Sequence, residues 1–227
     1  MLALKAFGVR FWAWERFCSI TVPLPHNLHV LMGYTIPLMD NILNSLISIV
    51  ALIIAITIHE FSHAYMSDRL GDPTARSQGR LSLNPLVHLD PIGTLMLLIA
   101  HFGWGKPVPV DPYNLRHPKR DYALISIAGP ISNILLAIIV TLLLKILPAS
   151  FAIFAIPLIY INILLAVFNL LPFHPLDGSH IFPDLFPGNT GMIILIFLIL
   201  PIFNGTSLIS YLIFPIVNFC LKLLAIL

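Results

Sequence analysis

Long apolar stretches, separated by short polar connections, constrain this chain more than any other feature of its sequence. Several of them approach the roughly 20 residues that an α-helix needs to cross the hydrocarbon core of a bilayer. Hydrophobic residues make up 58% of the chain and charged residues only 10%, whereas an average soluble domain has roughly 25% charged residues. Alternating segments are too few for a barrel, so helices remain as the way to satisfy the backbone in lipid. We therefore predict an all-α polytopic membrane protein.

The apolar segments predict about four to six transmembrane helices, counted against about 20 residues for one crossing. A polar connection is expected at residues 68–90, and the apolar segment 92–102 is so short that it indicates a re-entrant element. In residues 103–111, Pro107 and Pro109 alternate with valines and favour an extended backbone. Helices are expected at about residues 42–65, 122–146, 151–171, 192–203 and 208–227.

The first 38 residues differ in composition from the rest of the chain. They mix charged with aromatic residues, form no apolar run of spanning length and lack the cleavage site of a signal peptide. We expect residues 1–38 to be an N-terminal extension on the membrane surface. Residues 39–227 are expected to form a single transmembrane domain.

The positions of Lys and Arg indicate how the chain is oriented. These residues fall in segments 69–80 and 106–120, whereas the connections after residue 147 contain almost none. By the positive-inside rule both basic segments face the cytoplasm, and so does the C-terminal end of the first helix. The net charge is only +2 and no basic cluster is interleaved with aromatic residues, which argues against a nucleic-acid partner.

The end of the first predicted helix carries the sequence His59-Glu60-Phe61-Ser62-His63. At about 100° per residue, His59 and His63 lie within about 40° of each other, one turn apart on one helical face. Two imidazoles so placed bind one metal ion, and Glu60 reaches a water on that ion without being a ligand, as in zinc hydrolases. Solvated residues at a helix end would be the alternative. That alternative is disfavoured because the chain has nine His but only two Glu, and because ionisable groups in a membrane helix are expensive.

A catalytic zinc ion usually has three protein ligands and one open position, so a third ligand must come from elsewhere in the chain. Asp177 is the favoured residue, because it follows a helix end and lies between Pro175 and Gly178, where the backbone can bend inward. Asp177-Gly178 is also compatible with an ordinary turn, and spacing alone leaves the choice open. The alternatives on the same segment are His174, His180 and Asp184.

Three elements occur in a fixed order along the chain. They are His59-Glu60-Phe61-Ser62-His63, then Gly129-Pro130-Ile131-Ser132-Asn133, then Asn169-Leu170-Leu171-Pro172 followed by Asp177-Gly178. Together they resemble the site-2 protease family of membrane metalloproteases (peptidase family M50). The resemblance covers about residues 42–181 and is closest to the compact prokaryotic branch without an inserted PDZ domain. It implies that Asp177 completes the zinc site, although His174 stands where that family has a proline.

The resemblance also implies a function. A protein of this kind is a zinc metalloendopeptidase of the cell membrane, which hydrolyses peptide bonds within or next to the transmembrane segments of other membrane proteins. Its cofactor is Zn²⁺, and its partners are those substrates and the lipid bilayer. Glu60 is expected to accept a proton from the attacking water. Asn133 matches an asparagine that assists substrate or oxyanion binding in the family; alternatively it satisfies a neighbouring helix.

A helical substrate must be locally unwound, because a regular helix engages its carbonyls in internal hydrogen bonds. The extended segment with Val108 and Val110 is expected to pair with the unwound substrate by β-strand addition. A proline-rich loop without a substrate role is the alternative reading of that segment.

A metal transporter or channel is the main competing function, because intramembrane His and Asp also line ion pathways. Transport predicts several ligand sets across the membrane, whereas the ligands expected here converge on one site beside Glu60. A non-catalytic scaffold would have no need of an intact Glu60.

Overall fold

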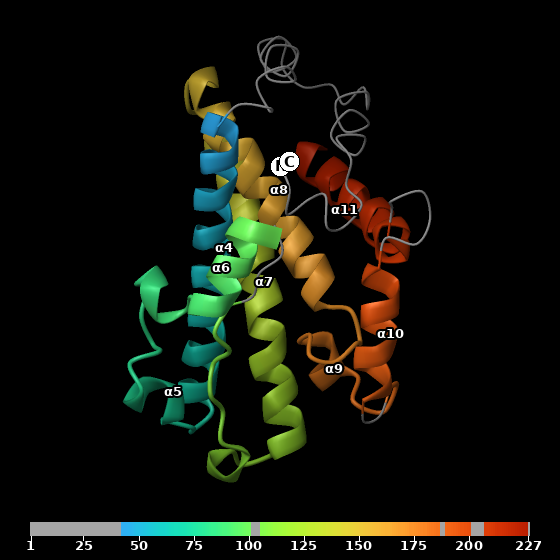
Figure 1. Ribbon diagram of the computed structural model, residues 1–227. Coiled ribbons are helices and arrows are strands. Elements are labelled where there is room, and N and C mark those ends of the chain that lie inside the picture. The colour runs from blue at the N-terminus through green and yellow to red at the C-terminus, as the bar shows by residue number, and fades with distance from the viewer. Residues whose placement is uncertain (1–41, 101–104, 187–188, 201–206, 227) are drawn as a thin grey trace.

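The computed structural model describes residues 42–100, 105–186, 189–200 and 207–226, which form a bundle of helices (Figure 1). Four helices in this part of the chain are long and apolar enough to cross a membrane. They are α4 (Ile42–Arg69), α7 (Pro118–Leu144), α8 (Ala152–Asn169) and α11 (Leu208–Ile226). The predicted class is confirmed, and the protein is a multi-pass membrane protein. The expected N-terminal extension, residues 1–38, lies outside the described residues.

Short helices occupy the connections between the long ones. The predicted helix boundaries agree with the structure to within a few residues; α4, for example, ends at Arg69 rather than at about residue 65. No glycine or proline interrupts α4 before Gly71, whose φ of 107° is incompatible with a continuing helix. The short elements are α5 (Thr74–Ser77), η2 (Pro85–Val87), α6 (Pro91–Ala100), η3 (Pro112–Asn114), η4 (Ala149–Phe151), α9 (Gly178–Ile181) and α10 (Thr190–Ile199).

The bundle has a packed interior and an apolar outer surface. Helix α7 packs against both α4 and α8, and α4 also packs against α8. A core of buried apolar side chains lies among α7, α8, α10 and α11, and includes Ile163, Leu195 and Val217. Large apolar side chains such as Leu135 and Phe219 are exposed on the outside of the long helices. Such a surface is unfavourable in water and is the expected one in lipid.

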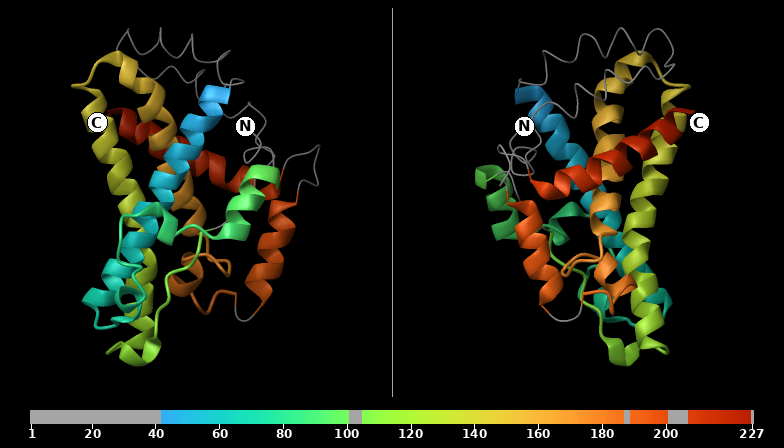
Figure 2. Two further views of the ribbon diagram at one scale, coloured as in Figure 1. Left: turned by 60° about the vertical axis from the view of Figure 1, so that its left-hand side comes forward. Right: turned by 90° about the vertical axis from the view of Figure 1, so that its right-hand side faces the viewer.

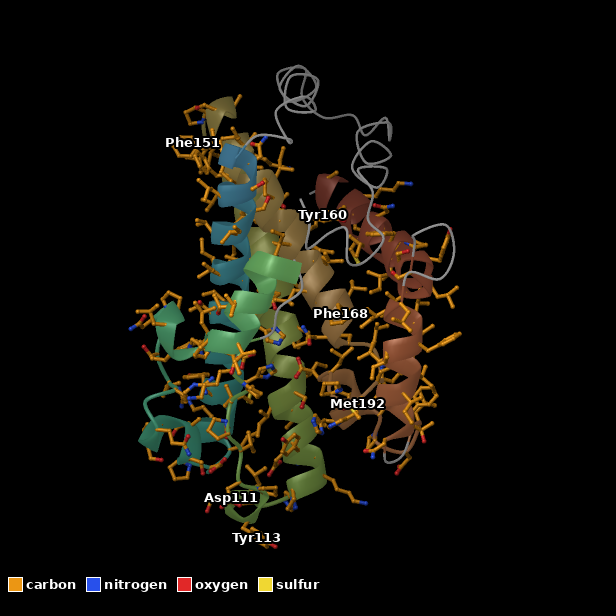
Figure 3. All side chains as sticks on the ribbon, in the orientation of Figure 1. Asp111, Tyr113, Phe151, Tyr160, Phe168 and Met192 are labelled. Atoms are coloured by element: carbon orange, nitrogen blue, oxygen red, sulfur yellow. The ribbon has the colours of Figure 1, made fainter. Side chains whose placement is uncertain are left out.

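Residues 70–117 leave and re-enter the bundle at the same end. In Figures 1 and 2, α5 and η3 lie at the end where α7 begins, whereas α6 lies at a height between the two ends of α4. Asp111 and Tyr113 mark that end in Figure 3, and Phe151 marks the opposite one. An antiparallel bridge joins Leu89 to Gly105, at the two legs of the excursion. Helix α6 fills most of the apolar segment that was predicted to be re-entrant, and its depth in the membrane stays a prediction.

Asp72 ties the re-entrant loop to the end of α4. Its side chain is fully buried and accepts hydrogen bonds from Ser67 Oγ (3.0 Å), Thr74 N (3.1 Å), Asn114 Nδ2 (2.9 Å) and Asp111 N (2.8 Å). Burial alone would raise the pKa of this carboxyl, but the hydrogen bonds lower it to about 2. One carboxylate thus joins α4, the start of α5 and the segment that leads into η3.

This clamp predicts a pH dependence of stability. The pKa of Asp72 is about 2 in the folded protein against its ordinary value of 3.8, so its contribution is complete above about pH 5 and is lost as the pH falls through about 2. A difference of this size corresponds to about 2 kcal/mol. The substitution Asp72→Asn should therefore lower the free energy of unfolding by about 2 kcal/mol at pH 6. The measurement is denaturant unfolding in detergent micelles.

The difference between wild type and Asp72→Asn should shrink as the pH falls from about 4 through 2, because the Asp72 carboxyl becomes protonated over this range. Asp184 is exposed, so Asp184→Asn is the matched control and should unfold like wild type at every pH. A difference that stays constant from pH 6 to pH 2 would contradict the assignment of this stabilisation to the Asp72 carboxylate.

Candidate metal centre

A four-residue repeat of small and polar side chains forms the buried face of α4. Ala51, Ala55, His59, His63 and Ser67 recur at this spacing and are all buried. Because four residues advance an α-helix by slightly more than one turn, these side chains lie in one stripe. The two imidazoles therefore point into the bundle, where α4 meets α7 and α8, rather than toward lipid.

Asp177 reaches the histidines from the connection that follows α8. The chain turns there so tightly that Gly178, the first residue of α9, has no room for a side chain. A Cβ at Gly178 would lie 2.3 Å from the carbonyl O of Leu171 and 2.4 Å from that of Leu170. The glycine of the Asp-Gly pair is thus required by the turn that carries Asp177 inward.

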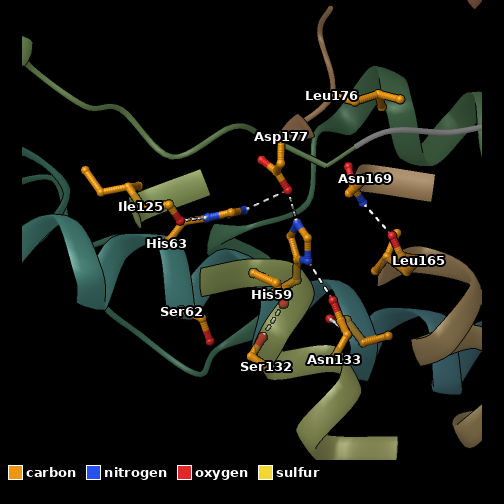
Figure 4. Close-up of polar contacts among 12 residues, drawn as sticks. His59, Ser62, His63, Ile125, Ser132, Asn133, Leu165, Asn169, Leu176 and Asp177 are labelled. Carbon is orange, nitrogen blue, oxygen red and sulfur yellow. Dashed lines mark hydrogen bonds and ion pairs between the residues drawn. The ribbon is translucent and has the colours of Figure 1, made fainter. Parts of the chain in front are cut away.

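The three predicted ligand side chains converge on one point (Figure 4). Asp177 Oδ2 lies 3.0 Å from His59 Nε2 and 3.3 Å from His63 Nε2, and all three ligand atoms lie within 4.8 Å of one another. Ligand atoms placed about 2.0 to 2.1 Å from a tetrahedral zinc ion are about 3.3 Å apart. Among the described residues, this is the one group of three such ligands. Its geometry fits a zinc ion.

Two atoms of this group give independent support for a metal. His63 Nε2 and Asp177 Oδ2 are buried and have no hydrogen-bond partner among the described residues, a costly arrangement unless another group binds them. A metal ion between these atoms would accept a lone pair from each of them and remove that cost.

The Nδ1 atoms of both imidazoles are bound to α7. His59 Nδ1 lies 2.6 Å from Asn133 Oδ1, and His63 Nδ1 lies 2.7 Å from the carbonyl O of Ile125. A carbonyl oxygen only accepts, so His63 donates from Nδ1 and presents the lone pair of Nε2 to the site. Partners of this kind orient the ligand rings of metal sites.

Gly129 allows α7 to approach the two imidazoles closely. A Cβ at this position would lie 2.5 Å from His63 Nε2 and 2.7 Å from His59 Cε1. Any side chain would therefore displace the rings. This close contact explains why the first residue of the Gly129-Pro130 pair is a glycine.

The alternative third ligands lie outside the group of converging atoms. His174 and Asp184 are exposed. His180 is half-buried and packs against Tyr122, with ring centroids 4.5 Å apart. Of the four candidates that the spacing left open, the structure brings only Asp177 to the histidines.

Glu60 lies at the re-entrant loop. It is half-buried, and its Oε1 lies 3.7 Å from the place that a Cβ of Gly105 would take.

Arg80, which sequence reasoning did not single out, is 4% exposed and donates to the carbonyl oxygens of Lys106 and Pro107. Burial lowers the pKa of the Arg80 guanidinium, and the charge of Glu60 opposes that shift. Among the described residues Arg80 is the one buried arginine. The sequence alone does not distinguish it from the exposed arginines.

The three residues predicted to contact the substrate lie in two places, Asn133 beside His59 and the two valines, Val108 and Val110, on the segment after Gly105. Asn133 is fully buried beside His59, and its Nδ2 donates to Ala55 O (3.0 Å) and to Asn162 Oδ1 (2.7 Å). Both amide hydrogens are engaged, so the predicted oxyanion contact requires Asn133 to release one of them. Val108 and Val110 are half-buried in the segment that runs from Gly105 toward η3. Their predicted roles, like that of Asn133, stay predictions.

Three relatives place the chain among known proteins. It is 45% identical over 150 residues to YwhC of Bacillus subtilis, which is assigned as a zinc metalloprotease, and the match covers 61% of this chain and 68% of YwhC. It is 34% identical to Rip2 of Mycolicibacterium smegmatis and 32% identical to Rip2 of Mycobacterium tuberculosis, both assigned likewise. These matches cover 136 residues, 56% of this chain and 52% of each relative, so the chain spans about half the length of Rip2. No family model and no solved structure matches the chain.

The converging geometry predicts how zinc content depends on the third ligand. The substitution Asp177→Asn should reduce bound zinc from about one ion per chain to a small fraction of that, because a neutral amide replaces the carboxylate ligand. Elemental analysis of purified, dialysed protein measures this content. The matched control Asp184→Asn should retain the metal, and a reversed result would move the third ligand to the later aspartate.

Proposed function

Because the chain belongs to the family of zinc metalloproteases that includes YwhC, we propose that it is a site-2-type endopeptidase (peptidase family M50). Its substrates are other membrane proteins, which it cleaves within or next to their transmembrane segments. The observation that carries the proposal is the convergence of His59, His63 and Asp177 on one point. The two histidines and Glu60 belong to α4, a helix long and apolar enough to span a membrane.

His59, His63 and Asp177 would hold the zinc ion, which supplies a Lewis acid and lowers the pKa of a water molecule toward about 7. Glu60 follows His59 on the same helical turn and faces the re-entrant loop. It accepts a proton from the attacking water and transfers that proton to the leaving amine. The burial of both histidines strengthens the electrostatic interactions of the site, because little water screens them.

The segment 105–111 is the proposed docking edge for the unwound substrate. Arg80 holds its start through the carbonyls of Lys106 and Pro107, and Asp72 holds its end through the N–H of Asp111. Between these points, no hydrogen bond joins the backbone N–H of Val108 or Val110 to a described backbone carbonyl. An extended backbone fixed at both ends and free between them suits β-strand addition.

The proposed location is the cell membrane, with the metal centre toward the cytoplasm. The His-Glu-His motif lies in the second half of α4, near the end from which the re-entrant loop departs. Exposed basic residues gather in the chain at that end: Arg69, Arg76, Arg116, Lys119 and Arg120. The positive-inside rule assigns such an end to the cytoplasmic side. Transport receives no comparable support, because one group of converging ligands occurs among the described residues.

The decisive variant is Glu60→Gln. It should lower kcat for a labelled transmembrane peptide by about 10²- to 10⁴-fold, because the amide cannot accept the proton of water, while the zinc content stays that of wild type. A metal chelator should abolish wild-type cleavage. Among the described residues, Ser62 on the same turn donates its side-chain hydrogen bond to Ile58 O of its own helix, so Ser62→Ala is the control. Undiminished cleavage by Glu60→Gln would remove the role assigned to the carboxylate.

The docking edge is tested through the backbone rather than the side chain. Val110→Pro removes one N–H while keeping an extended backbone, and should raise the KM of the peptide about fivefold or more if that N–H pairs with the substrate. Val110→Thr retains both the N–H and the β-branched shape, and should keep the wild-type KM. Equal KM values for the two variants would argue that the segment is a loop without a substrate role.

A further inference from the structure

Two buried asparagines link the three helices that surround the metal centre. Asn133 on α7 and Asn162 on α8 are both fully buried, and Asn133 Nδ2 donates to Asn162 Oδ1 at 2.7 Å. Asn133 also contacts His59 on α4 through its Oδ1. Asn162 was not expected in the site from its place in an apolar helix, and it touches the metal ligand only through Asn133.

The orientation of each amide follows from partners that can only accept. Asn162 Nδ2 donates to the carbonyl O of Leu158 at 2.8 Å, which leaves Asn162 Oδ1 as an acceptor facing Asn133. Asn133 Nδ2 meets that oxygen and also the carbonyl O of Ala55 at 3.0 Å. Both partners of this nitrogen are acceptors, so the amide cannot be flipped without two repulsive contacts.

The same chain of hydrogen bonds sets the state of the imidazole. Asn133 Oδ1 accepts, so His59 must donate from Nδ1 across the 2.6 Å contact. The lone pair of His59 then lies on Nε2, the atom that is 3.0 Å from Asp177 Oδ2. A backbone carbonyl on α8 thus acts on the ligand atom of α4 through two side-chain amides.

We propose that Asn162 is a positioning residue of the metal centre, which acts through Asn133 to hold His59 in the ring orientation and tautomer that bind zinc. The inference rests on the zinc site of the proposed function, but it concerns metal binding rather than cleavage. It assigns Asn133 the same positioning role, since both of its amide hydrogens are engaged. Partners that orient a histidine ligand typically contribute about 10- to 100-fold to metal affinity.

A purely structural role is the competing explanation, because polar side chains also join membrane helices by hydrogen bonds. The two roles differ in what they affect. Helix association by Asn162 changes the stability of the bundle but not the metal affinity of molecules that remain folded. Positioning changes the affinity and the coordination geometry, and requires the effects of Asn133 and Asn162 to be coupled.

The experiment is a double-mutant cycle on the purified full chain, with Zn²⁺ affinity measured by chelator competition and geometry by the absorption spectrum of bound Co²⁺. Asn133→Leu should weaken Zn²⁺ binding about 10- to 100-fold and Asn162→Leu about tenfold. The double variant should bind no more weakly than Asn133→Leu. Asn218, an asparagine of α11, provides the control: Asn218→Leu should bind Zn²⁺ like wild type.

A conservative variant guards against simple misfolding. In Asn162→Asp, the buried carboxyl in its neutral form can donate to Leu158 O and accept from Asn133, so affinity should return to within about threefold of wild type. Additive effects of the two leucine substitutions would overturn the proposal. So would wild-type Zn²⁺ affinity and Co²⁺ spectrum in folded Asn162→Leu. If affinity follows the proposal but the wild type cleaves no membrane peptide, the proposed function fails and the positioning role stands.

Discussion

The structure depends on placing two imidazoles and a carboxylate inside a bundle that lipid surrounds. Each buried polar atom there must have a partner, because an unsatisfied one costs about 1–3 kcal/mol or more. The Nδ1 atoms of His59 and His63 find theirs on α7. The remaining ligand atoms converge with Asp177 Oδ2 and are left for a metal ion. The packing of the spanning helices therefore also determines the geometry of the zinc ligands.

Small residues leave the space that this close packing requires. Ala51 and Ala55 continue the histidine stripe of α4, and Gly129 brings α7 so close that a Cβ would overlap the rings. Gly178 performs the corresponding task for the carboxylate, whose turn leaves no space for a side chain. Close approach of backbones is how membrane helices pack when lipid supplies little hydrophobic driving force between them. Here the same close approach brings the ligands within coordination distance.

The re-entrant loop shows how far prediction reached. It was predicted from the short apolar segment 92–102 and the basic segments on both sides, because the bilayer sets the length of a crossing and positive charge sets the side. Its anchoring did not follow. Asp72 and Arg80 look like the other charged residues of a polar connection, yet both are buried and hold the extended segment from opposite ends. Hydrogen bonds between residues 26 to 39 positions apart leave no periodic signal in the sequence.

The sequence by itself determined the helical membrane class, the approximate helix boundaries and the pairing of His59 with His63, because these depend on segment length and on the helical repeat. It left four candidates for the third ligand and gave no indication of Asn162. Tertiary structure decided both, since the connection after α8 turns Asp177 inward and leaves His174 and Asp184 exposed. The directions of the Asn133 and Asn162 amides were likewise decided by backbone carbonyls, that of Ala55 on α4 and that of Leu158 on α8. Contacts between distant segments are set by packing, which local sequence pattern does not encode.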